Sequence, residues 1–333
     1  MIKDRIKEYC NTLGLDLIGF IKCREFNELR EFYNKRKELN IENAFEENDI
    51  DKRINPMHYM SAGKTIITIA FPYLFDINYK DNGFSVYTRG EDYHKILKLY
   101  LDKICNYISE ELNGNTLSFV DSNTLPERYI AYLGGIGYIG KNNLLITKEY
   151  GSYVFLGEII MDLEIENYDN ENINFEDVFK FKHCRNCNIC YDKCPTKAIN
   201  NSLKNSNICL SYITQQKDIE DKWFSLLNGR VFGCDTCQNY CPHNMKIKKS
   251  SIIEFYPLDF ANNCNIDDII SINKGDFNKT LKRTSCGWRG KNVLSRNALI
   301  KKYMFDNDDI KDLTITSTYV EEYKNRLLKI KKL

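Results

Sequence analysis

The amino-acid sequence predicts an α+β protein whose first part, residues 1–165, is built from layers of helices and strands. Three observations predict this class. Apolar residues recur at helical spacing in two segments, short β-rich runs end near Gly or Pro, and the two kinds of segment alternate along the chain. With 333 residues, the chain is long enough for two or three domains.

Local patterns give the elements of this first part in order. Ile2, Ile6, Tyr9 and Leu13 fall on one face of an opening helix that Gly14 ends. The next elements are expected as strands at 17–21, 65–71 and 117–120, a helix at 97–112, and a short helix from residue 126. The third of these strands ends just before Asp121.

The last strands are expected at 143–147 and 153–161, joined as a hairpin by a turn at 150–152. The stretch 164–176 is acidic and rich in Asn, and we interpret it as a linker. Residues 135–140 match the dinucleotide pattern G-x-G-x-x-G, but that fingerprint requires a strand before it and a helix after it. The order expected here is the reverse, so the glycines should serve a tight turn or a close approach of the backbone to a large ligand.

Eight of the thirteen cysteines lie between residues 184 and 241. The first run is C-x2-C-x2-C-x3-C-P, a lone cysteine follows, and the second run is C-x2-C-x3-C-P. The first run is typical of bacterial ferredoxins that hold two [4Fe-4S] clusters, in which the fourth cysteine binds the other cluster. We therefore assign one cluster to Cys184, Cys187, Cys190 and Cys241, and the other to Cys194, Cys209, Cys234 and Cys237.

Two other uses of these cysteines fit the pattern less well. A zinc ribbon also uses paired C-x2-C motifs, but a single tetrahedral ion would leave half of the thiols idle. A disulfide framework is disfavoured because a chain of this length buries a core unaided and no apolar signal segment follows Met1. The five scattered cysteines are expected to be small buried apolar residues: Cys10, Cys23, Cys105, Cys264 and Cys286.

Charge and hydropathy indicate where the protein is located and what it can bind. No apolar run approaches the roughly 18 residues of a membrane span, so we expect a cytoplasmic protein, without membrane contact and monomeric. Residues 246–333 carry 18 Lys and Arg against 11 Asp and Glu, whereas the chain as a whole is nearly balanced. This basic end is a candidate contact for polyanions.

Several segments carry a resemblance to one enzyme family. The segments VDSNTLPER (120–128) and GIGYIGKN (135–142) resemble the central signature of the epoxyqueuosine reductase family. The same holds for YTRGEDYH (87–94), CLSYIT (209–214) and GCDTC (233–237), and matching pieces run in family order from about residue 49 to residue 297.

This resemblance implies an oxidoreductase that performs the last step of queuosine biosynthesis, the reduction of epoxyqueuosine to queuosine in tRNA with loss of water. It implies a nitroreductase-like cobalamin-binding domain at 1–165, a ferredoxin-like domain with two [4Fe-4S] clusters at 166–250, and a basic, mainly helical, HEAT-like region at 251–333. The cofactor would be base-off cob(II)alamin, reduced through the clusters by a low-potential electron donor whose identity the resemblance does not give. In longer members the C-terminal helical repeats extend further than here.

The resemblance also assigns residues. Asp121 corresponds to the family's proton donor, a role that a carboxyl group can fill if burial against an apolar corrin raises its pKa; a helix cap is its ordinary alternative. His94 is expected to start or pack a helix and not to bind cobalt, because no glycine completes the D-x-H-x-x-G pattern. Cobalamin contacts carry over to Arg53, Ser85, Asp121, Leu156, Ser211, Asp235 and Thr236.

The basic end gains a partner from the same resemblance, namely tRNA with a queuosine-type anticodon loop. The cations expected to contact it surround Trp288: Lys282, Arg283, Arg289, Lys291, Arg296, Lys301 and Lys302. Three other readings stay open at this point. They are a corrinoid reductase of the reductive dehalogenase kind, a ferredoxin-like electron carrier without a corrin, and a zinc-ribbon RNA-binding protein.

Overall fold

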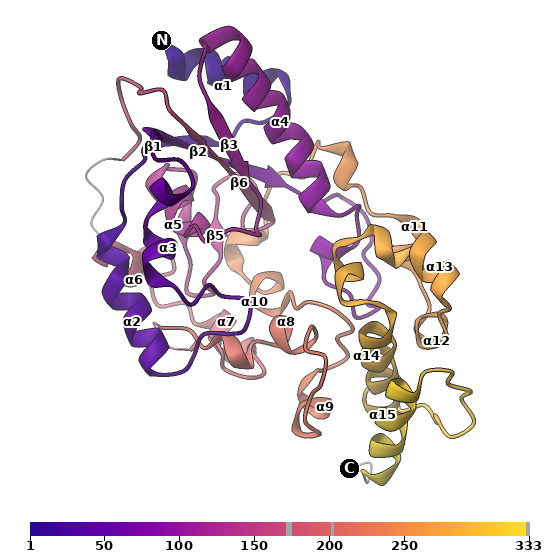
Figure 1. Ribbon diagram of the computed structural model, residues 1–333. Helices are drawn as coiled ribbons and strands as arrows, with labels where there is room; N and C mark the ends of the chain where they lie inside the picture. The colour runs from indigo at the N-terminus through magenta and orange to yellow at the C-terminus, as the bar shows by residue number, and fades with distance from the viewer. Residues whose placement is uncertain (171–174, 201–202, 331–333) are drawn as a thin grey trace.

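The computed structural model describes residues 1–170, 175–200 and 203–330, and within these the chain is a mixture of helices and strands, as expected (Figure 1). Its centre is a four-stranded antiparallel sheet in the order β1-β2-β6-β3. The strands are β1 (Ile18–Lys22), β2 (Thr65–Pro72), β3 (Thr116–Phe119) and β6 (Val154–Met161).

Helices cover both faces of this sheet (Figure 1). On one face, α1 (Ile2–Thr12) and α4 (Tyr93–Leu112) bury Ile6, Leu101 and Ile104 against Ile67 and its neighbours on the sheet. The other face packs against α2 (Arg30–Glu38), α3 (Ile50–Ile54) and α5 (Glu127–Leu133). The alternation of Ile66 and Ile67 between the two cores is the period-two pattern of a strand buried on both faces.

The predicted hairpin at 143–161 is wrong. Its first run forms β5 (Leu145–Ile146), which pairs with β4 (Tyr138–Ile139), while β6 lies between β2 and β3. Only Thr147 and Gly151 bridge near the expected turn. The glycine-rich segment 135–140 follows a helix and contains β4, so it has no dinucleotide-binding context. Its Gly137 lies against the backbone of Ile146, where a side chain would clash.

The predicted linker at 164–176 is wrong over its described part. Asp169 lies along the edge of β1, where its carboxylate accepts a hydrogen bond from the Phe20 amide at 2.9 Å and its own amide donates to the Phe20 carbonyl at 2.8 Å. Lys3 adds an ion pair with Asp169 at 2.7 Å. Residues 171–174 lie outside the described residues. The described part up to residue 170 therefore packs on the domain, and the description resumes just before α6 (Glu176–Lys180).

The second half is helical and contains the cysteines. The short helices near them are α7 (Ile189–Lys193), α8 (Leu210–Ile213), α9 (Lys222–Leu226) and α10 (Thr236–Asn239). They are followed by α11 (Asp259–Asn263), α12 (Ile266–Ile270), α13 (Lys274–Lys279), α14 (Lys291–Met304) and α15 (Thr318–Lys329). One core joins Leu210 to Leu327 and includes Phe84 from the first half, so the segment after Cys209 packs with the C-terminal helices. No described helix is long and apolar enough to cross a membrane.

Candidate functional site

The seven cysteines of the two runs and the lone Cys209 gather into two groups of four, and each group takes cysteines from both runs. Cys184, Cys187, Cys190 and Cys241 line one small cavity together with Pro242 and His243. Burial raises the pKa of Cys237, and the nearby thiols of Cys234, Cys209 and Cys194 raise it further. The structure therefore brings together the two groups of four that the spacing predicted. The first cysteine group is Cys184, Cys187, Cys190 and Cys241, and the second is Cys194, Cys209, Cys234 and Cys237.

Donors lie beside these thiols. The Lys141 amide donates to Cys184 Sγ at 3.5 Å, and Arg230 Nε donates to Cys234 Sγ at 3.0 Å. Such N–H···S bonds stabilise the negative charge of iron-sulfur clusters and tune their potentials. Two groups of four thiols fit two [4Fe-4S] clusters, each of which takes four thiolates.

Asp121 stands two residues after β3 and meets the start of α4. Its backbone has the left-handed φ of 51°, which turns the chain sharply after the strand. Its Oδ2 accepts a hydrogen bond from the Tyr93 hydroxyl at 2.6 Å and lies 3.2 Å from His94 Nε2. The other ring nitrogen of His94 lies 2.7 Å from Asp92, which also caps the helix. His94 thus starts α4, as expected, but its ring also joins Asp121, which the sequence did not indicate.

The pKa values of Asp121 and His94 are shifted in opposite directions. Its side chain is 59% exposed, and hydrogen bonds from His94 and Tyr93 lower its pKa although burial opposes them. Burial also disfavours the charged ring of His94, but the hydrogen bonds and charges of Asp121 and Asp92 raise its pKa to about 9. The expected rise in the pKa of Asp121 depends on burial against a corrin and stays a prediction. In the protein alone, the opposite shifts of the two pKa values favour a protonated His94 beside an ionised Asp121 at neutral pH.

Two further carboxyl groups lie behind Asp121, and sequence reasoning missed both. Glu127, the first residue of α5, accepts hydrogen bonds from the Asp121 amide at 3.1 Å and the Asn123 side chain at 2.7 Å. Burial and the charge of Asp121 raise its pKa. Glu158 on β6 is fully buried opposite Thr68, and neither of its oxygens has a hydrogen-bond partner in the described part of the chain. Burial raises its pKa well above the ordinary range, which keeps it neutral.

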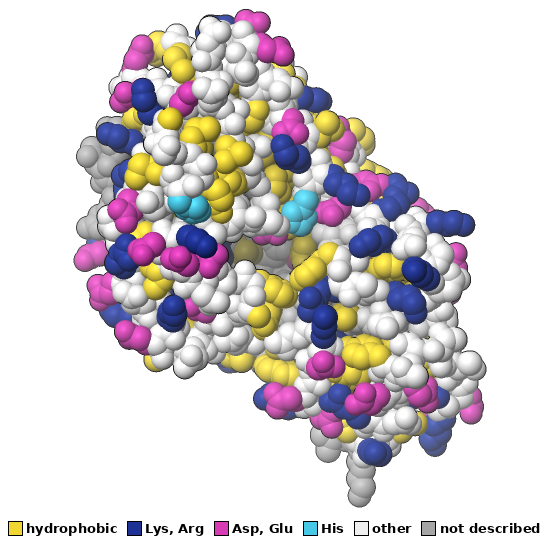
Figure 2. Space-filling model, in the orientation of Figure 1, with side chains coloured by type: hydrophobic (Ala, Val, Ile, Leu, Met, Phe, Trp, Pro, Cys, Tyr) yellow, Lys and Arg dark blue, Asp and Glu magenta, His cyan; other side chains and the backbone are white. Residues whose placement is uncertain are grey.

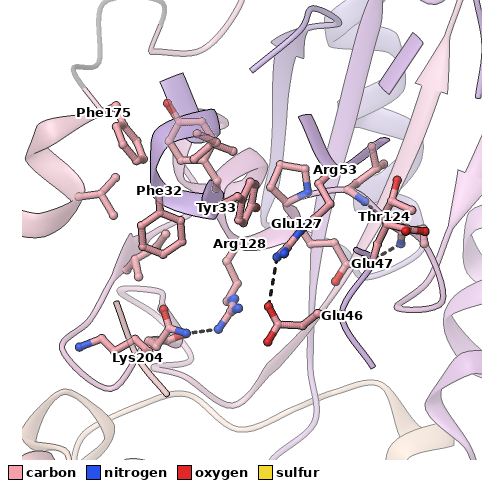
Figure 3. A pocket seen from close by; sticks show the side chains of 18 of the residues that line it. Phe32, Tyr33, Glu46, Glu47, Arg53, Thr124, Glu127, Arg128, Phe175 and Lys204 are labelled. Atoms are coloured by element: carbon pink, nitrogen blue, oxygen red, sulfur yellow. Dashed lines mark hydrogen bonds and ion pairs between the residues drawn. The ribbon is translucent and has the colours of Figure 1, made fainter. Parts of the chain in front are cut away.

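A cavity of about 300 Å³ adjoins Asp121 (Figure 3). Its walls combine cations with aromatic rings that come mainly from α2, α5 and α6: Phe32, Tyr33, Arg53, Arg128, Phe175, Phe179 and Lys204. Arg53 points into it, lies 3.7 Å from the centre of the Tyr33 ring, and pairs with Glu42 at 2.7 Å and Glu46 at 3.3 Å. A mixture of aromatic rings and charges of this kind suits a ligand that carries both apolar faces and polar groups.

The other expected cofactor contacts lie beside the second cysteine group. Ser85 donates to Asp235 at 2.5 Å, and Asp235 also accepts the Val86 amide at 2.7 Å. Thr236 lies 3.5 Å from Cys234 Sγ. These bonds join the segment that precedes α4 to the loop that holds the second cysteine group.

Tyr87 connects this region to Asp121. Its pKa is raised by burial and by the charge of Asp235, while Ser211 opposes the rise, and its ring lies 6.5 Å from that of Tyr93. Leu156 stands apart from the polar residues, half-buried on β6. Figure 2 shows the surface hollowed between the sheet lobe and the helical lobe.

The basic C-terminal region needs a correction. Arg296 is fully buried in α14 and donates to two backbone carbonyls, to Asn297 and to Tyr319, so it stabilises the fold and cannot reach RNA. Three of the other cations are paired with acidic residues: Arg283 with Glu91, Lys301 with Asp306, and Lys302 with Asp267 and Asp308. Lys282 and Lys291 have no ion pair within the described residues.

Comparisons with known proteins agree with this site. Residues 183–244 match a family model described as a 4Fe-4S double cluster binding domain, and residues 53–122 match one described as epoxyqueuosine reductase QueG, DUF1730. The chain is 33% identical to an epoxyqueuosine reductase of Bacillus anthracis, over 90% of this chain and 79% of the relative. It is 32% identical to that of Bacillus subtilis, over 90% and 78%.

Solved structures give the same result. An epoxyqueuosine reductase with an epoxyqueuosine-modified tRNA-Tyr stem loop superimposes with a TM-score of 0.80 at 31% identity, over 90% of this chain and 80% of that chain. An epoxyqueuosine reductase from Bacillus subtilis, whose catalytic loop is swung out of the active site, gives 0.81 at 28% identity, over 99% and 95%.

Proposed function

Because the chain belongs to the epoxyqueuosine reductase family, we propose that it reduces epoxyqueuosine to queuosine in tRNA, with electrons that pass through its two cysteine groups. The observation that carries this proposal is the meeting of two fourfold cysteine groups with the Tyr93–His94–Asp121 cluster in one molecule. Electron carriers need the cysteines alone. A cluster of proton-bearing side chains is needed where a substrate oxygen must leave.

The proposed cofactors are two [4Fe-4S] clusters and base-off cob(II)alamin. Cobalamin, when bound, supplies the low-valent metal centre that reduces the epoxide carbon. Residues proposed to hold it are Arg53, Ser85, Asp121, Leu156, Ser211, Asp235 and Thr236. The aromatic and cationic walls of the cavity beside Arg53 support this proposal, because a corrin presents apolar faces with polar amide and phosphate groups at its edges. His94 is held by two aspartates, which leaves it no role as a cobalt ligand.

Protons set the second requirement. Converting an epoxide to an alkene and water consumes two electrons and two protons, so the carbon–oxygen bonds cannot both break without acids at the oxygen. His94 holds one proton at neutral pH and shares a hydrogen bond with Asp121 Oδ2, which points away from the sheet with 59% of its side chain exposed. We assign to Asp121 the transfer of protons to the departing oxygen. His94 would reprotonate Asp121, and Tyr93 would orient its carboxylate.

The proposed domain divisions, substrate and electron donor rest on the resemblance to the family. The divisions 1–165, 166–250 and 251–333 would be a nitroreductase-like cobalamin domain, a ferredoxin-like domain and a short HEAT-like region. The substrate would be tRNA with a queuosine-type anticodon loop, bound by a monomer in the cytoplasm. A low-potential donor would deliver electrons to the first cysteine group, whose cavity is lined by Lys141 and His243.

The test is reconstitution of the whole protein. Anaerobically purified protein should hold about eight irons and one cobalamin per chain, and should convert epoxyqueuosine in tRNA to queuosine with a chemical reductant, measured by mass spectrometry of the nucleosides. Cells that lack the protein should accumulate epoxyqueuosine. A fully loaded protein that leaves epoxyqueuosine unchanged in tRNA would refute the proposed function.

A further inference from the structure

Three distant segments bring exposed aromatic rings together at one place on the surface. Phe45 comes from the loop after α2, Tyr212 from α8, and Trp288 from a 3-10 turn (Ser285–Arg289) before α14. The ring of Phe45 lies 5.0 Å from that of Tyr212 and 5.5 Å from that of Trp288. Phe45 is nevertheless 49% exposed and Trp288 53% exposed. These rings form a surface cluster and not a core.

Arg289 fixes this aromatic cluster. Its guanidinium lies 4.5 Å from the centre of the Trp288 ring and 5.7 Å from that of Phe45. It also donates to the carbonyl of Gln215, which fastens the turn to the end of α8. The Tyr212 hydroxyl accepts the Ala44 amide at 3.4 Å and so holds the loop of Phe45. The exposed rings are therefore held in place before any partner binds.

The cluster borders the proposed active site on two sides. Phe45 lines the same cavity as Asp121 and Arg53. Tyr212 follows Ser211, and its amide donates to the carbonyl of Cys209 in the second cysteine group at 2.9 Å. Figure 2 shows hydrophobic side chains on the rim of the hollow between the two lobes, with Lys and Arg close by. Phe45 thus belongs both to the wall of the cavity and to the aromatic cluster.

We propose that Phe45, Trp288 and Arg289 form a stacking platform for an unpaired RNA base next to the base that enters the cavity. This inference rests on the proposed function and names a contact of the same site. Aromatic rings and a guanidinium plane bind the face of any base, which suits a loop nucleotide that must leave its stack when its neighbour is turned out. Lys282 and Lys291, on either side of the Trp288 turn, carry charges that suit the adjoining phosphates.

The occupant is RNA and not a protein because cations without an ion pair among the described residues flank the exposed rings. A second copy of this chain would bring the same cations and would be repelled. The platform also explains why these aromatic residues are not buried. Burial of each ring away from water would lower the free energy, and an RNA base that stacks on the rings would bury them only in the complex.

The two tryptophans of the chain make the platform measurable. Trp223 is 9% exposed and serves as an internal reference, whereas Trp288 is half-exposed. An unmodified anticodon stem loop added to the whole protein should quench the emission of Trp288 by stacking. Trp288→Phe should remove that signal but keep an affinity close to that of the wild type. Trp288→Leu keeps apolar volume without a ring and should weaken binding about 5- to 150-fold, as should Phe45→Leu.

Controls separate the platform from folding and from the proposed function. Leu99→Ala, a 51% exposed apolar residue on α4, should leave RNA affinity unchanged, and the Trp288 variants should keep the iron content and melting temperature of the wild type. If the wild type binds and reduces tRNA but Trp288→Leu binds equally well, the platform is refuted while the function stands. If the wild type neither binds nor reduces tRNA, the proposed function fails first. A wild type that is dimeric, with Trp288→Leu monomeric, would make the cluster a subunit interface and overturn the inference.

Discussion

Replacing Asp121 with Asn should lower the pKa of His94, because the substitution removes the carboxylate that lies 3.2 Å from its Nε2. With a pKa of about 9, His94 is about 90% protonated at pH 8, whereas an ordinary histidine of pKa near 6.5 would be about 3% protonated. Asp92 remains 2.7 Å from Nδ1 in the variant, so we expect a fall of about 1 to 2 units and not a return to 6.5.

The raised pKa of His94 also makes the free energy of unfolding depend on pH. The folded-state pKa of His94 is raised, so its stabilising contribution is complete below pH 6.5 and is lost as pH rises through about 9. The side chain is 37% exposed, and solvent screening limits the contribution to about 1 kcal/mol. The free energy of unfolding should therefore lose this small amount between pH 7 and pH 10 in the wild type, and less in Asp121→Asn.

Two assays check the reasoning. The four histidines of the chain can be resolved by NMR, with His94→Gln to assign the signal. Single-turnover reduction of tRNA should fall on the alkaline side near pH 9 in the wild type, and Asp121→Asn should lose about 10²- to 10⁴-fold in rate. Asp102→Asn is the matched control, because Asp102 is a half-buried aspartate on the same helix that pairs with Lys98 and not with His94. A wild-type His94 that titrates near pH 6.5, or an unchanged titration in Asp121→Asn, would contradict the proton assignment.

Three other substitutions test separate parts of the structure. Glu127→Ala should speed hydrogen exchange of the Asp121 amide and slow turnover, whereas Glu127→Gln keeps the acceptor and should exchange like the wild type; equal exchange in both would exclude the hydrogen bond as the hold on this loop. Arg296→Met should lower the free energy of unfolding by about 3–5 kcal/mol in denaturant titrations, because it leaves buried carbonyls unpaired; a stable variant with weak RNA binding would return Arg296 to the RNA surface. Cys209→Ser should reduce the iron content from about eight to about four and stop reduction, while Cys105→Ser should retain both; full iron in Cys209→Ser would remove it from the ligand set.

Local patterns predicted the strands well because each strand carries its own signal. The runs at 65–71 and 153–161 correspond to β2 and β6, and every predicted end lies within one residue of the observed end. Pairing could not be predicted in the same way. The run 153–161 is apolar on both faces, and such a strand suits the middle of a sheet as well as a hairpin, so nothing in it chose β2 and β3 over β5.

The site was predicted unevenly for a related reason. Fixed spacing limits which cysteines can meet, so the two fours could be assigned from the sequence. His94 and Glu127 meet Asp121 only because the starts of α4 and α5 converge at the end of β3, and no spacing carries that information. Arg296 was misassigned because a charged residue in a basic segment is usually exposed, whereas α14 is buried on nearly every side.

The concentration of carboxyl groups around one histidine has a physical reason in the proposed reaction. In the proposed reaction, electrons would add negative charge at the substrate, and negative charge near an acid raises that acid's proton affinity. Glu127 already has a raised pKa, and Glu158 is held neutral by burial, so the acids closest to the sheet are the first to take or keep protons. His94 then holds the proton that faces the exposed side of Asp121. In the proposed reaction this arrangement would link proton supply to electron supply, because added negative charge would hold protons on the acids at this end of β3.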